Sequence, residues 1–231
     1  MTAATLPQGD EKRQAVRQMF DAIAGRYEMV NTIMSFGLDG PWRRRCLDAL
    51  DLPAGSLVLD VACGTGDLCR DLLARAMRPV GLDLSAGMLA AARTSAPLVL
   101  ADAVASPFPS GAFDGAVSGF SLRNIVDLPL FYAELARLVR PGGRVSLLDL
   151  AQPQNKLLRL GHRIWSGRAV PLVGSLLSDS GAYHYLPKSL AYLPAADEMA
   201  GLLREAGFAA VEHQFLSGGV AQLYTATRRL A

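Results

Sequence analysis

The sequence predicts an α/β protein with a mainly parallel seven-stranded sheet, helices on both faces and an antiparallel hairpin at the sheet edge. Short apolar segments alternate with helical ones through the middle of the chain, which is typical of parallel sheets. Small residues at 62–66 join the first of these strands to a helix. Two strand-like segments near the carboxyl terminus are separated by Ser217-Gly218-Gly219, and this spacing predicts the hairpin.

Helices are expected before the sheet. Residues 1–10 are polar and predict a flexible tail. In residues 11–27 apolar side chains recur at helical spacing, and Gly25 provides a stop. A second helix is expected from Pro41, which suits a first helical turn, to a point before Pro53. Residues 11–52 therefore form an N-terminal helical segment.

The alternation that defines the core occupies residues 53–151. Strands are expected at 56–61, 79–83, 98–101, 113–119 and 144–150, with helices at 67–75, 85–93 and 127–139. Residues 152–182 mix apolar pairs with arginines and predict an inserted helical cap. Residues 183–231 complete the core with a helix at 195–206, ended by Gly207, and strands near 209–215 and 220–227. We expect one domain over residues 1–231.

Composition narrows the classes of partner. The 23 basic and 21 acidic residues leave a net charge of +2 without a long run of one sign, so a nucleic-acid partner is not expected. The three cysteines and three histidines lack metal-ligand spacing, so no metal is expected, and the thiols suggest a reducing cytoplasm. No apolar stretch reaches the ~18 residues of a membrane span, which leaves at most peripheral membrane contact.

The glycine loop at 62–66 predicts a ligand site at the carboxyl end of the first strand. A dinucleotide fold is one alternative, because Asp83 lies where a ribose would be held. However, Cys69 occupies the third glycine position, and Asp67 at the helix start would repel a pyrophosphate. A phosphate-free nucleoside, and above all one with a positively charged sulfonium, suits this loop better.

Four acids follow successive predicted strands and are interpreted as a cradle for that ligand. Asp60 and Asp67 flank the loop, Asp83 ends the second strand, and Asp102 follows the third. Asp83 can accept hydrogen bonds from both ribose hydroxyls, and Asp102 can meet an adenine amino group. The alternative is that each acid merely caps a helix or ends a strand.

Several motifs spread along the chain carry a family resemblance. They include Met19-Phe20-Asp21, the glycine loop, Ser121-Leu122-Arg123-Asn124 and Tyr183-His184-Tyr185-Leu186-Pro187. With these the sequence resembles the Rossmann-like class I methyltransferases, and more narrowly the ubiquinone/menaquinone biosynthesis C-methyltransferase (UbiE) family. The glycine loop is shared by many methyltransferases, whereas the Leu-Arg-Asn and Tyr-His-Tyr-Leu-Pro segments are more specific.

The resemblance implies S-adenosylmethionine as cofactor and a lipophilic quinol or other aromatic compound as acceptor. The expected cofactor site comprises Asp60, Cys63, Gly64, Thr65, Gly66, Asp83, Leu84, Asp102, Ala103 and Gly119. Arg123 and Asn124 would line the reacting centre, where a protonated arginine stabilises developing negative charge or holds a water. The alternative for Arg123 is a salt bridge that braces a loop.

The expected acceptor pocket comprises Tyr27, Asn31, Tyr183, His184 and Tyr185. His184 is the histidine considered as a proton acceptor, since carbon attack requires a ring hydroxyl to lose its proton. The apolar stripes of the N-terminal segment and the cap would accommodate a lipophilic tail, or alternatively form ordinary core or a homodimer face.

Four positions depart from the family pattern, namely Glu28, Asp39, Gly119 and Asp149. They leave three hypotheses open. The first is C-methylation of a prenylated hydroquinone, demethylmenaquinol to menaquinol. The second is C- or O-methylation of an aromatic specialised metabolite, and the third is an inactive cofactor-binding scaffold in quinone biosynthesis, against which the retained Arg123 and Asn124 argue.

Overall fold

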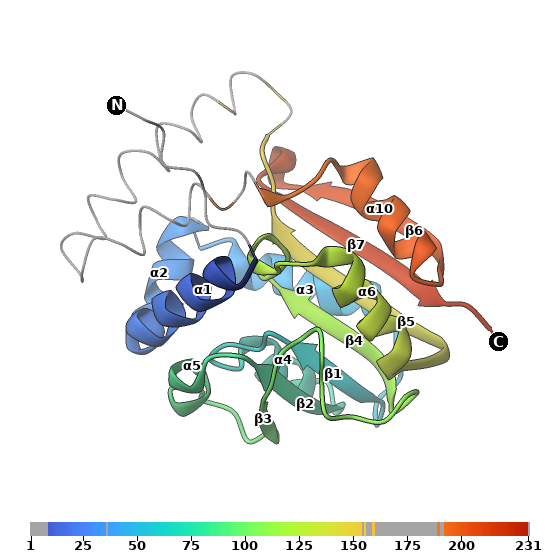
Figure 1. Ribbon diagram of the computed structural model, residues 1–231, viewed down its shortest axis with the longest axis horizontal. Helices are drawn as coiled ribbons and strands as arrows, with labels where there is room; N and C mark the ends of the chain where they lie inside the picture. Colours follow the sequence, from blue (N-terminus) through green and yellow to red (C-terminus); the bar gives the residue numbers. More distant parts are fainter. Residues whose placement is uncertain are drawn as a thin grey trace.

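The structure is a computed structural model that describes residues 9–35, 37–153, 155, 159, 189 and 192–230. Its centre is a seven-stranded sheet in the order β3-β2-β1-β4-β5-β7-β6 (Figure 1). The strands are β1 (Leu57–Val61), β2 (Arg78–Asp83), β3 (Leu98–Leu100), β4 (Phe113–Gly119), β5 (Val139–Leu150), β6 (Phe208–Leu216) and β7 (Ala221–Arg228). The prediction of a mainly parallel α/β sheet with an edge hairpin is confirmed.

The pairing of the strands creates a crevice in the middle of the sheet. Strands β1 to β5 pair in parallel, whereas β7 is antiparallel to both β5 and β6. The chain leaves β1 toward β2 and β3 and then returns to place β4 on the other side of β1. The connections therefore diverge at the carboxyl ends of β1 and β4, which is where open α/β sheets bind ligands.

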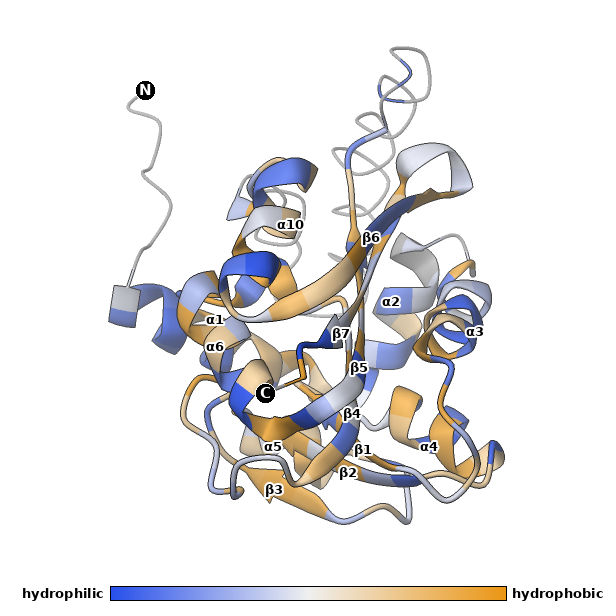
Figure 2. Ribbon diagram, turned by 90° about the vertical axis from the view of Figure 1, so that its right-hand side faces the viewer, coloured by the Kyte–Doolittle hydropathy of each residue, from blue (hydrophilic) through white to orange (hydrophobic). Residues whose placement is uncertain are grey.

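Helices cover both faces of the sheet. α3 (Asp39–Leu50) and α4 (Asp67–Ala74) pack on one face, and α6 (Leu128–Leu138) and α10 (Ala196–Glu205) pack on the other (Figure 2). The larger apolar cluster joins α6 and α10 to the sheet through side chains such as Phe131, Leu135 and Leu203. A second cluster, with Leu47 and Leu72, joins α3 and α4 to Val58 and Val117.

The N-terminal segment lies at the carboxyl end of the sheet. α1 (Gly9–Ile23) contacts α5 (Ala86–Ala90) and the 3-10 turn η2 (Leu122–Asn124), and the turn η1 (Ala24–Arg26) links it to α2 (Tyr27–Met34). The single helix expected over 11–27 therefore starts two residues earlier and breaks at the turn containing Gly25. Gly9 and Asp10, expected in the tail, belong to α1.

Two other boundaries differ from expectation for local reasons. The helix expected over 85–93 ends at Ala90, because the backbone N–H of Arg93 donates to the carbonyl of Thr65 in the glycine loop, at 3.1 Å, instead of continuing the helix. Strand β5 starts at Val139 rather than 144, since Val139 already pairs with Phe113 before the register shifts. The segment after Ala90 is therefore hydrogen-bonded to the glycine loop and helps to hold it in place.

Two expectations fall mainly on residues that the structure does not describe. Of the cap expected over 152–182, only positions 152, 153, 155 and 159 are described, and Tyr183, His184 and Tyr185 lie outside the described residues. In the described part of the chain, no helix has both the length and the apolar character needed to cross a bilayer.

Candidate active site

Two adjoining cavities lie where the carboxyl ends of β1, β2 and β4 meet α1 and α2. The first is about 350 Å³ and is bounded by α1, the ends of β2 and β4, and the start of α6. The second, smaller cavity lies against the glycine loop and α4. Among the described residues, five line both cavities: Tyr27, Ala62, Gly64, Gly119 and Phe120. The two cavities therefore form one continuous site of the size that small-molecule ligands occupy.

Asp83 holds the glycine loop against the end of β2. Its Oδ2 accepts a hydrogen bond from the N–H of Gly64 and its Oδ1 accepts one from the N–H of Ser85, both at 2.8 Å. Burial raises the pKa of this carboxyl. Each oxygen retains acceptor capacity beyond its backbone donor, so Asp83, which lines the first cavity beside Leu84, can also accept from a pair of ligand hydroxyls.

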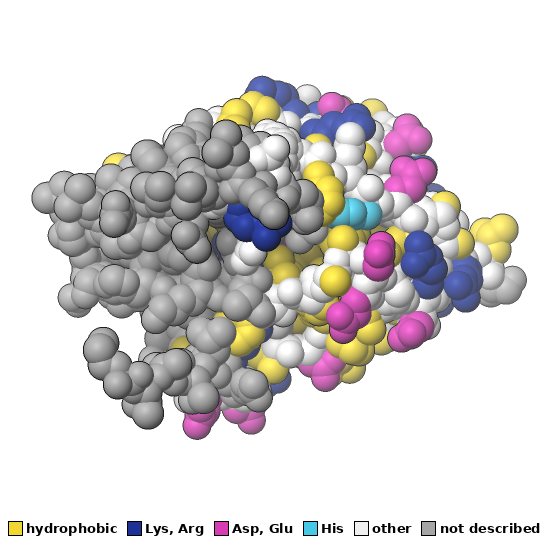
Figure 3. Space-filling view, turned by 90° about the horizontal axis from the view of Figure 1, so that it is seen from above, with side chains coloured by type: hydrophobic (Ala, Val, Ile, Leu, Met, Phe, Trp, Pro, Cys, Tyr) yellow, Lys and Arg dark blue, Asp and Glu magenta, His cyan; other side chains and the backbone are white. Residues whose placement is uncertain are grey.

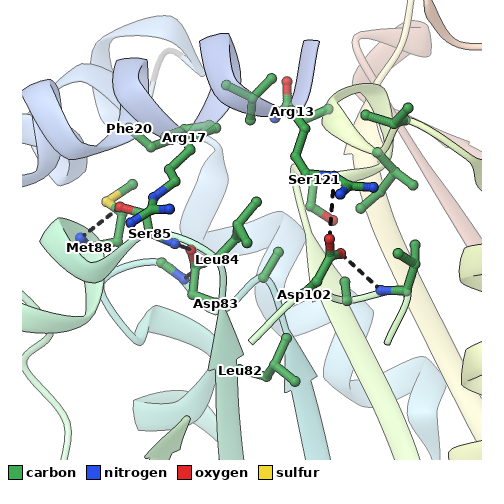
Figure 4. Close-up of a pocket in the computed structure, with 18 of the residues that line it drawn as sticks. Arg13, Arg17, Phe20, Leu82, Asp83, Leu84, Ser85, Met88, Asp102 and Ser121 are labelled. Carbon is green, nitrogen blue, oxygen red and sulfur yellow. Dashed lines mark hydrogen bonds and ion pairs between the residues drawn. The ribbon is translucent and has the colours of Figure 1, made fainter. Parts of the chain in front are cut away.

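Asp102 lies on the opposite side of the first cavity, beside Ala103. Its Oδ1 accepts from the N–H of Val104 at 3.1 Å, and its Oδ2 lies 3.4 Å from Nε of Arg13 on α1. Figure 4 shows Arg13 reaching down from the helix to this carboxylate, with Arg17 and Phe20 over Ser85 and Met88. α1 therefore forms the roof of the cavity and contributes charged groups to it.

Two residues that line the second cavity carry a buried oxygen atom without a hydrogen-bond partner among the described residues. Asp60 is 1% exposed and Thr65 is 3% exposed, and both side chains line this cavity. Asp60 Oδ2 accepts from Sγ of Cys69 at 3.2 Å, whereas Asp60 Oδ1 and Thr65 Oγ1 have no partner among the described residues. Buried polar atoms are rarely left unpaired, so these two oxygens indicate where a polar ligand group binds.

Burial also changes the ionisation of the groups in this cavity. It raises the pKa of Asp60 to about 7, although the hydrogen bond from Cys69 acts in the opposite direction. Burial raises the pKa of the Tyr27 hydroxyl to about 12, partly offset by the charge of Arg123. At neutral pH Tyr27 is therefore protonated and acts as a hydrogen-bonding group, not as a base. Because the pKa of Asp60 is close to neutral pH, a bound cation would favour its ionised form.

The backbone at the end of β1 and β4 has conformations that side chains seldom adopt. Ala62 and Phe120 have φ values of +56° and +62°, and both residues line both cavities. Such strain persists only where the surroundings impose it, and it is frequent at functional sites. Gly66, at φ +81°, caps α4, and a Cβ there would lie 2.7 Å from Cγ2 of Thr94.

The expected reacting pair, Arg123 and Asn124, divides into two different environments. Arg123 is 3% exposed and lines neither cavity. Its guanidinium forms an ion pair with Asp149, and its backbone N–H donates a hydrogen bond to the same carboxylate at 3.0 Å. Asn124 lines the first cavity, and its buried Oδ1 has no partner among the described residues. The structure thus places Asn124 in the site and Arg123 behind it, as a brace for η2.

The departures from the family pattern lie mostly outside the cavities. Glu28 pairs with Arg70 at 3.2 Å, and Asp39 pairs with Arg43 at 2.7 Å. Neither of these acids nor Asp149 lines a cavity. Gly119 does, and a Cβ there would lie 3.1 Å from Cδ1 of Leu68, so a side chain would be tight.

A family model described as the ubiE/COQ5 methyltransferase family matches residues 8–228. The chain belongs to the ubiE/COQ5 methyltransferase family. It is an S-adenosylmethionine-dependent methyltransferase, and the recognition made from its motifs is confirmed.

Individual relatives of this methyltransferase agree over nearly its whole length. A ubiquinone/menaquinone biosynthesis C-methyltransferase UbiE from Syntrophotalea carbinolica is 37% identical, covering 94% of this chain and 95% of the relative. A demethylmenaquinone methyltransferase from Thermus thermophilus is 39% identical, covering 91% of this chain and 100% of the relative.

Solved structures agree with the fold. A Haemonchus contortus phosphoethanolamine N-methyltransferase 2 in complex with S-adenosyl-L-methionine superposes with a TM-score of 0.62, at 16% identity, over 81% of this chain and 52% of that one. The likeness shows that both chains share the class I methyltransferase fold.

The structure brings most of the predicted site residues of the methyltransferase together. Of the expected cofactor residues, only Gly66 lines neither cavity, and of the expected acceptor residues Tyr27 and Asn31 line the second cavity. Sequence reasoning missed Arg13 and Arg17 on α1, Arg43 on α3 and the strained Phe120. Phe20, by contrast, belonged to a motif already noted, and its place over the cavity gives that motif a physical reason.

Proposed function

We propose that this methyltransferase transfers the methyl group of S-adenosylmethionine to a ring carbon of a prenylated hydroquinone, converting demethylmenaquinol to menaquinol. The observation that carries the proposal is agreement over nearly the full length with relatives named for this quinone chemistry, at 37% and 39% identity. The cavity supports it, since much of its lining is apolar, including Val16, Phe20, Ile125 and Leu130.

In this proposal residues of both cavities would hold the cofactor. Asp83 would accept hydrogen bonds from the ribose hydroxyls, and Asp102, beside Ala103, from the adenine amino group, while Leu84 and Met88 would contact the adenosine part. Cys63, Gly64, Thr65 and Asp60 would hold the methionine part. The two orphan oxygens there match the polar groups of an amino acid, so the residues present fit the cofactor.

The enzyme's own contribution is to hold and orient the acceptor. S-adenosylmethionine supplies an activated methyl group, so alignment of the ring carbon with that group is the main requirement. We propose that Asn124, which lines the first cavity and has a buried Oδ1 without a partner among the described residues, binds a ring hydroxyl and thereby fixes the ring. Arg123 acts as a positioning residue: its pair with Asp149 fixes η2, and its charge partly offsets the rise that burial causes in the pKa of Tyr27.

The mouth of the first cavity suits a lipophilic acceptor. Val126 and Leu130 line this cavity and are 37% and 48% exposed. Seen from above, hydrophobic side chains gather in the middle of the face (Figure 3). We propose that the prenyl tail leaves the site past these side chains, and that the enzyme works in the cytoplasm with peripheral contact to the membrane that holds the quinone.

Three of the four residues that depart from the family pattern do not favour a different acceptor, and the fourth, Gly119, lines both cavities. Glu28, Asp39 and Asp149 pair with arginines and line neither cavity. The hypothesis of an aromatic specialised metabolite therefore gains no support from them. The scaffold hypothesis is also disfavoured, because Asn124 lines the first cavity and retains a polar atom without a partner among the described residues.

The test compares acceptors under reducing conditions. The purified enzyme is incubated with labelled S-adenosylmethionine and, separately, with demethylmenaquinol, a demethylated benzoquinol and non-prenylated phenols, and products are identified by mass. The proposal predicts the highest kcat/KM for demethylmenaquinol. Preferential methylation of a non-prenylated phenol would support the metabolite hypothesis, and cofactor binding without any product would support a scaffold.

A further inference from the structure

Lys12 on α1 carries a buried ammonium to which sequence reasoning gave no role. The residue is 4% exposed, and its Nζ donates a hydrogen bond to the backbone carbonyl of Ile125 at 2.8 Å. Nζ also lies 3.9 Å from the centroid of the Tyr192 ring, which is within the range of a cation–π interaction. One side chain therefore joins α1 to the end of η2 and to the segment that precedes α10.

The charge of Lys12 is held without a carboxylate from the part of the chain that the structure describes. Burial alone lowers the pKa of its amino group to about 8, so the group is still charged at neutral pH. The next residue, Arg13, lies near Asp10 and Asp102 instead. An ammonium that is buried without a counter-charge is costly, and ionisable groups with shifted pKa values beside a cavity are frequent at functional sites.

The carbonyl that Lys12 binds belongs to the segment that carries Asn124. Asp149 on β5 holds this segment from behind, by accepting from the backbone N–H of Arg123 at 3.0 Å. Lys12 holds its end at Ile125, one residue after Asn124. Asn124 and Ile125 both line the first cavity. The wall of the cavity that carries Asn124 is therefore fixed between β5 and α1.

Lys12 and Asp21 attach α1 at different places around the first cavity. Asp21, near the end of the helix, accepts from the backbone N–H of Gly87 on α5 at 2.9 Å. Lys12, near the start of the helix, reaches Ile125 beyond the end of β4. The contact of Asp21 lies on the cofactor side of the site, whereas the contact of Lys12 lies on the side of Asn124.

We propose that Lys12 is a positioning residue for methyl transfer: by binding the carbonyl of Ile125, its ammonium fixes the wall that carries Asn124 and thereby sets how the acceptor ring is held. Lys12 lines neither cavity, so it acts through this backbone and not by contact with the cofactor or the acceptor. The inference rests on the proposed function in one respect, that the acceptor occupies the first cavity, and not on which acceptor it is.

The test separates acceptor kinetics from cofactor affinity. Lys12→Met keeps an unbranched apolar side chain but removes the charge and the donors. It is compared with the wild type in steady-state methylation of demethylmenaquinol and in calorimetric binding of S-adenosylmethionine. We expect kcat/KM for the acceptor to fall about 10- to 100-fold, because small displacements of a positioned group are costly. The affinity for the cofactor should change less than about threefold, since none of its own contacts is removed.

Two variants keep a folding defect apart from a positioning defect. Gln14→Met introduces the same side chain at an exposed position of α1 and should retain wild-type kinetics. Lys12→Arg keeps a positive donor that can bind a carbonyl and stack on an aromatic ring, so it is expected to recover part of the kcat/KM that Lys12→Met loses.

A measurement on the wild type does not depend on whether any variant folds. The chain has three lysines, Lys12, Lys156 and Lys188, so NMR of enzyme labelled with ¹³C-lysine should give few side-chain signals. We expect one of them to titrate with a pKa of about 8, below the usual value for lysine, and to be absent from Lys12→Arg.

Three results would overturn the positioning role. They are a folded Lys12→Met enzyme with the wild-type kcat/KM, a loss of cofactor affinity as large as the loss of kcat/KM, and a Lys12 signal that titrates like an exposed lysine. Failure of the proposed function is seen separately, because the wild type would then methylate another compound better than demethylmenaquinol. Lys12→Met is in that case assayed with that compound, and the same loss of kcat/KM is expected.

Discussion

Asp60 shows how a single buried side chain links cofactor binding to pH. Its pKa is raised to about 7 by burial, so the folded protein retains a proton that the unfolded chain would lose near pH ~4. The contribution of Asp60 to stability is therefore fully present below about pH 4, where both states hold the proton, and is lost as the pH rises through about 7. A bound ammonium reverses the preference, because it stabilises the carboxylate.

We therefore predict that the affinity for S-adenosylmethionine rises as the pH increases from about 6 to about 7.5, by less than about tenfold per pH unit, since one proton is released. Calorimetry in buffers of different ionisation enthalpy measures both the affinity and the released proton. The affinity for 5′-methylthioadenosine should stay level over this range. An unchanged pH dependence in Asp60→Asn would assign the effect to another group.

Arg123 is a residue for which the local sequence suggests a role at the reacting centre, whereas its surroundings suggest a structural role. The Leu-Arg-Asn motif predicted an arginine at the reacting centre, but the guanidinium is buried against Asp149, which itself is fully buried. The partner lies on β5, 26 positions away, so no local signal could reveal it. Removing only one partner of a buried ion pair strongly destabilises the folded protein, because the other charge stays buried without a partner.

We predict that Asp149→Leu lowers the free energy of unfolding by about 3–5 kcal/mol, because Arg123 is left as an unpaired buried charge. The double variant Arg123→Met with Asp149→Leu should recover most of that loss, which denaturant unfolding measures. Its kcat should nevertheless remain low, since the positive charge near Tyr27 is gone. Full recovery of both stability and kcat would show that Arg123 only braces the loop, and normal turnover in Arg123→Ala would remove it from the mechanism.

At the scale of elements, α1 is the part of the site least apparent from the alternation of strands and helices. Three of its side chains attach it across the first cavity. Lys12 donates to the carbonyl of Ile125 at 2.8 Å, Arg13 faces Asp102, and Asp21 accepts from Ser85 and from the N–H of Gly87. The hydrogen bond from Ser85 lowers the pKa of Asp21, so this attachment persists at neutral pH.

We predict that Asp21→Ala loosens α1 without unfolding the sheet. Loss of two hydrogen bonds to a charged group should cost about 1–2 kcal/mol locally and speed amide exchange in α1 about 5- to 30-fold. Affinity for the cofactor should fall as well, because α1 roofs the first cavity. Glu11→Ala, an exposed acid on the same helix, is the matched control; equal exchange in the two variants would mean that Asp21 does not hold the helix.

Elements with a strong local pattern were predictable, whereas their limits depended on distant contacts. Apolar runs such as β1 and the capped helix α6 were expected close to their observed positions. The helix after β2 was expected to be longer, because nothing local in residues 91–93 signals that the Arg93 backbone bonds to the glycine loop. The periodicity of apolar residues indicates which face of a helix is buried, but it does not indicate that a distant backbone group will take over one of the helix's hydrogen bonds.

At the scale of the whole molecule, sequence reasoning located the residues that follow successive strands. Asp60, Asp83 and Asp102 could be placed at one edge, since parallel strands bring their carboxyl ends together. Arg13 and Arg43 could not, because they reach the cavities from helices that precede the sheet and whose packing has no signature in the sequence. The cofactor side of the site was therefore more predictable than its roof.

This methyltransferase is proposed to transfer the methyl group of S-adenosylmethionine to a ring carbon of a prenylated quinol. The most direct measurement uses cofactor with a ¹³C-labelled methyl group and demethylmenaquinol, followed by NMR of the isolated product. We predict that the label is bonded to a quinone ring carbon and that the product remains labelled after reoxidation to the quinone. A label on an oxygen atom, or none on the ring when the enzyme is demonstrably loaded with cofactor, would contradict the account.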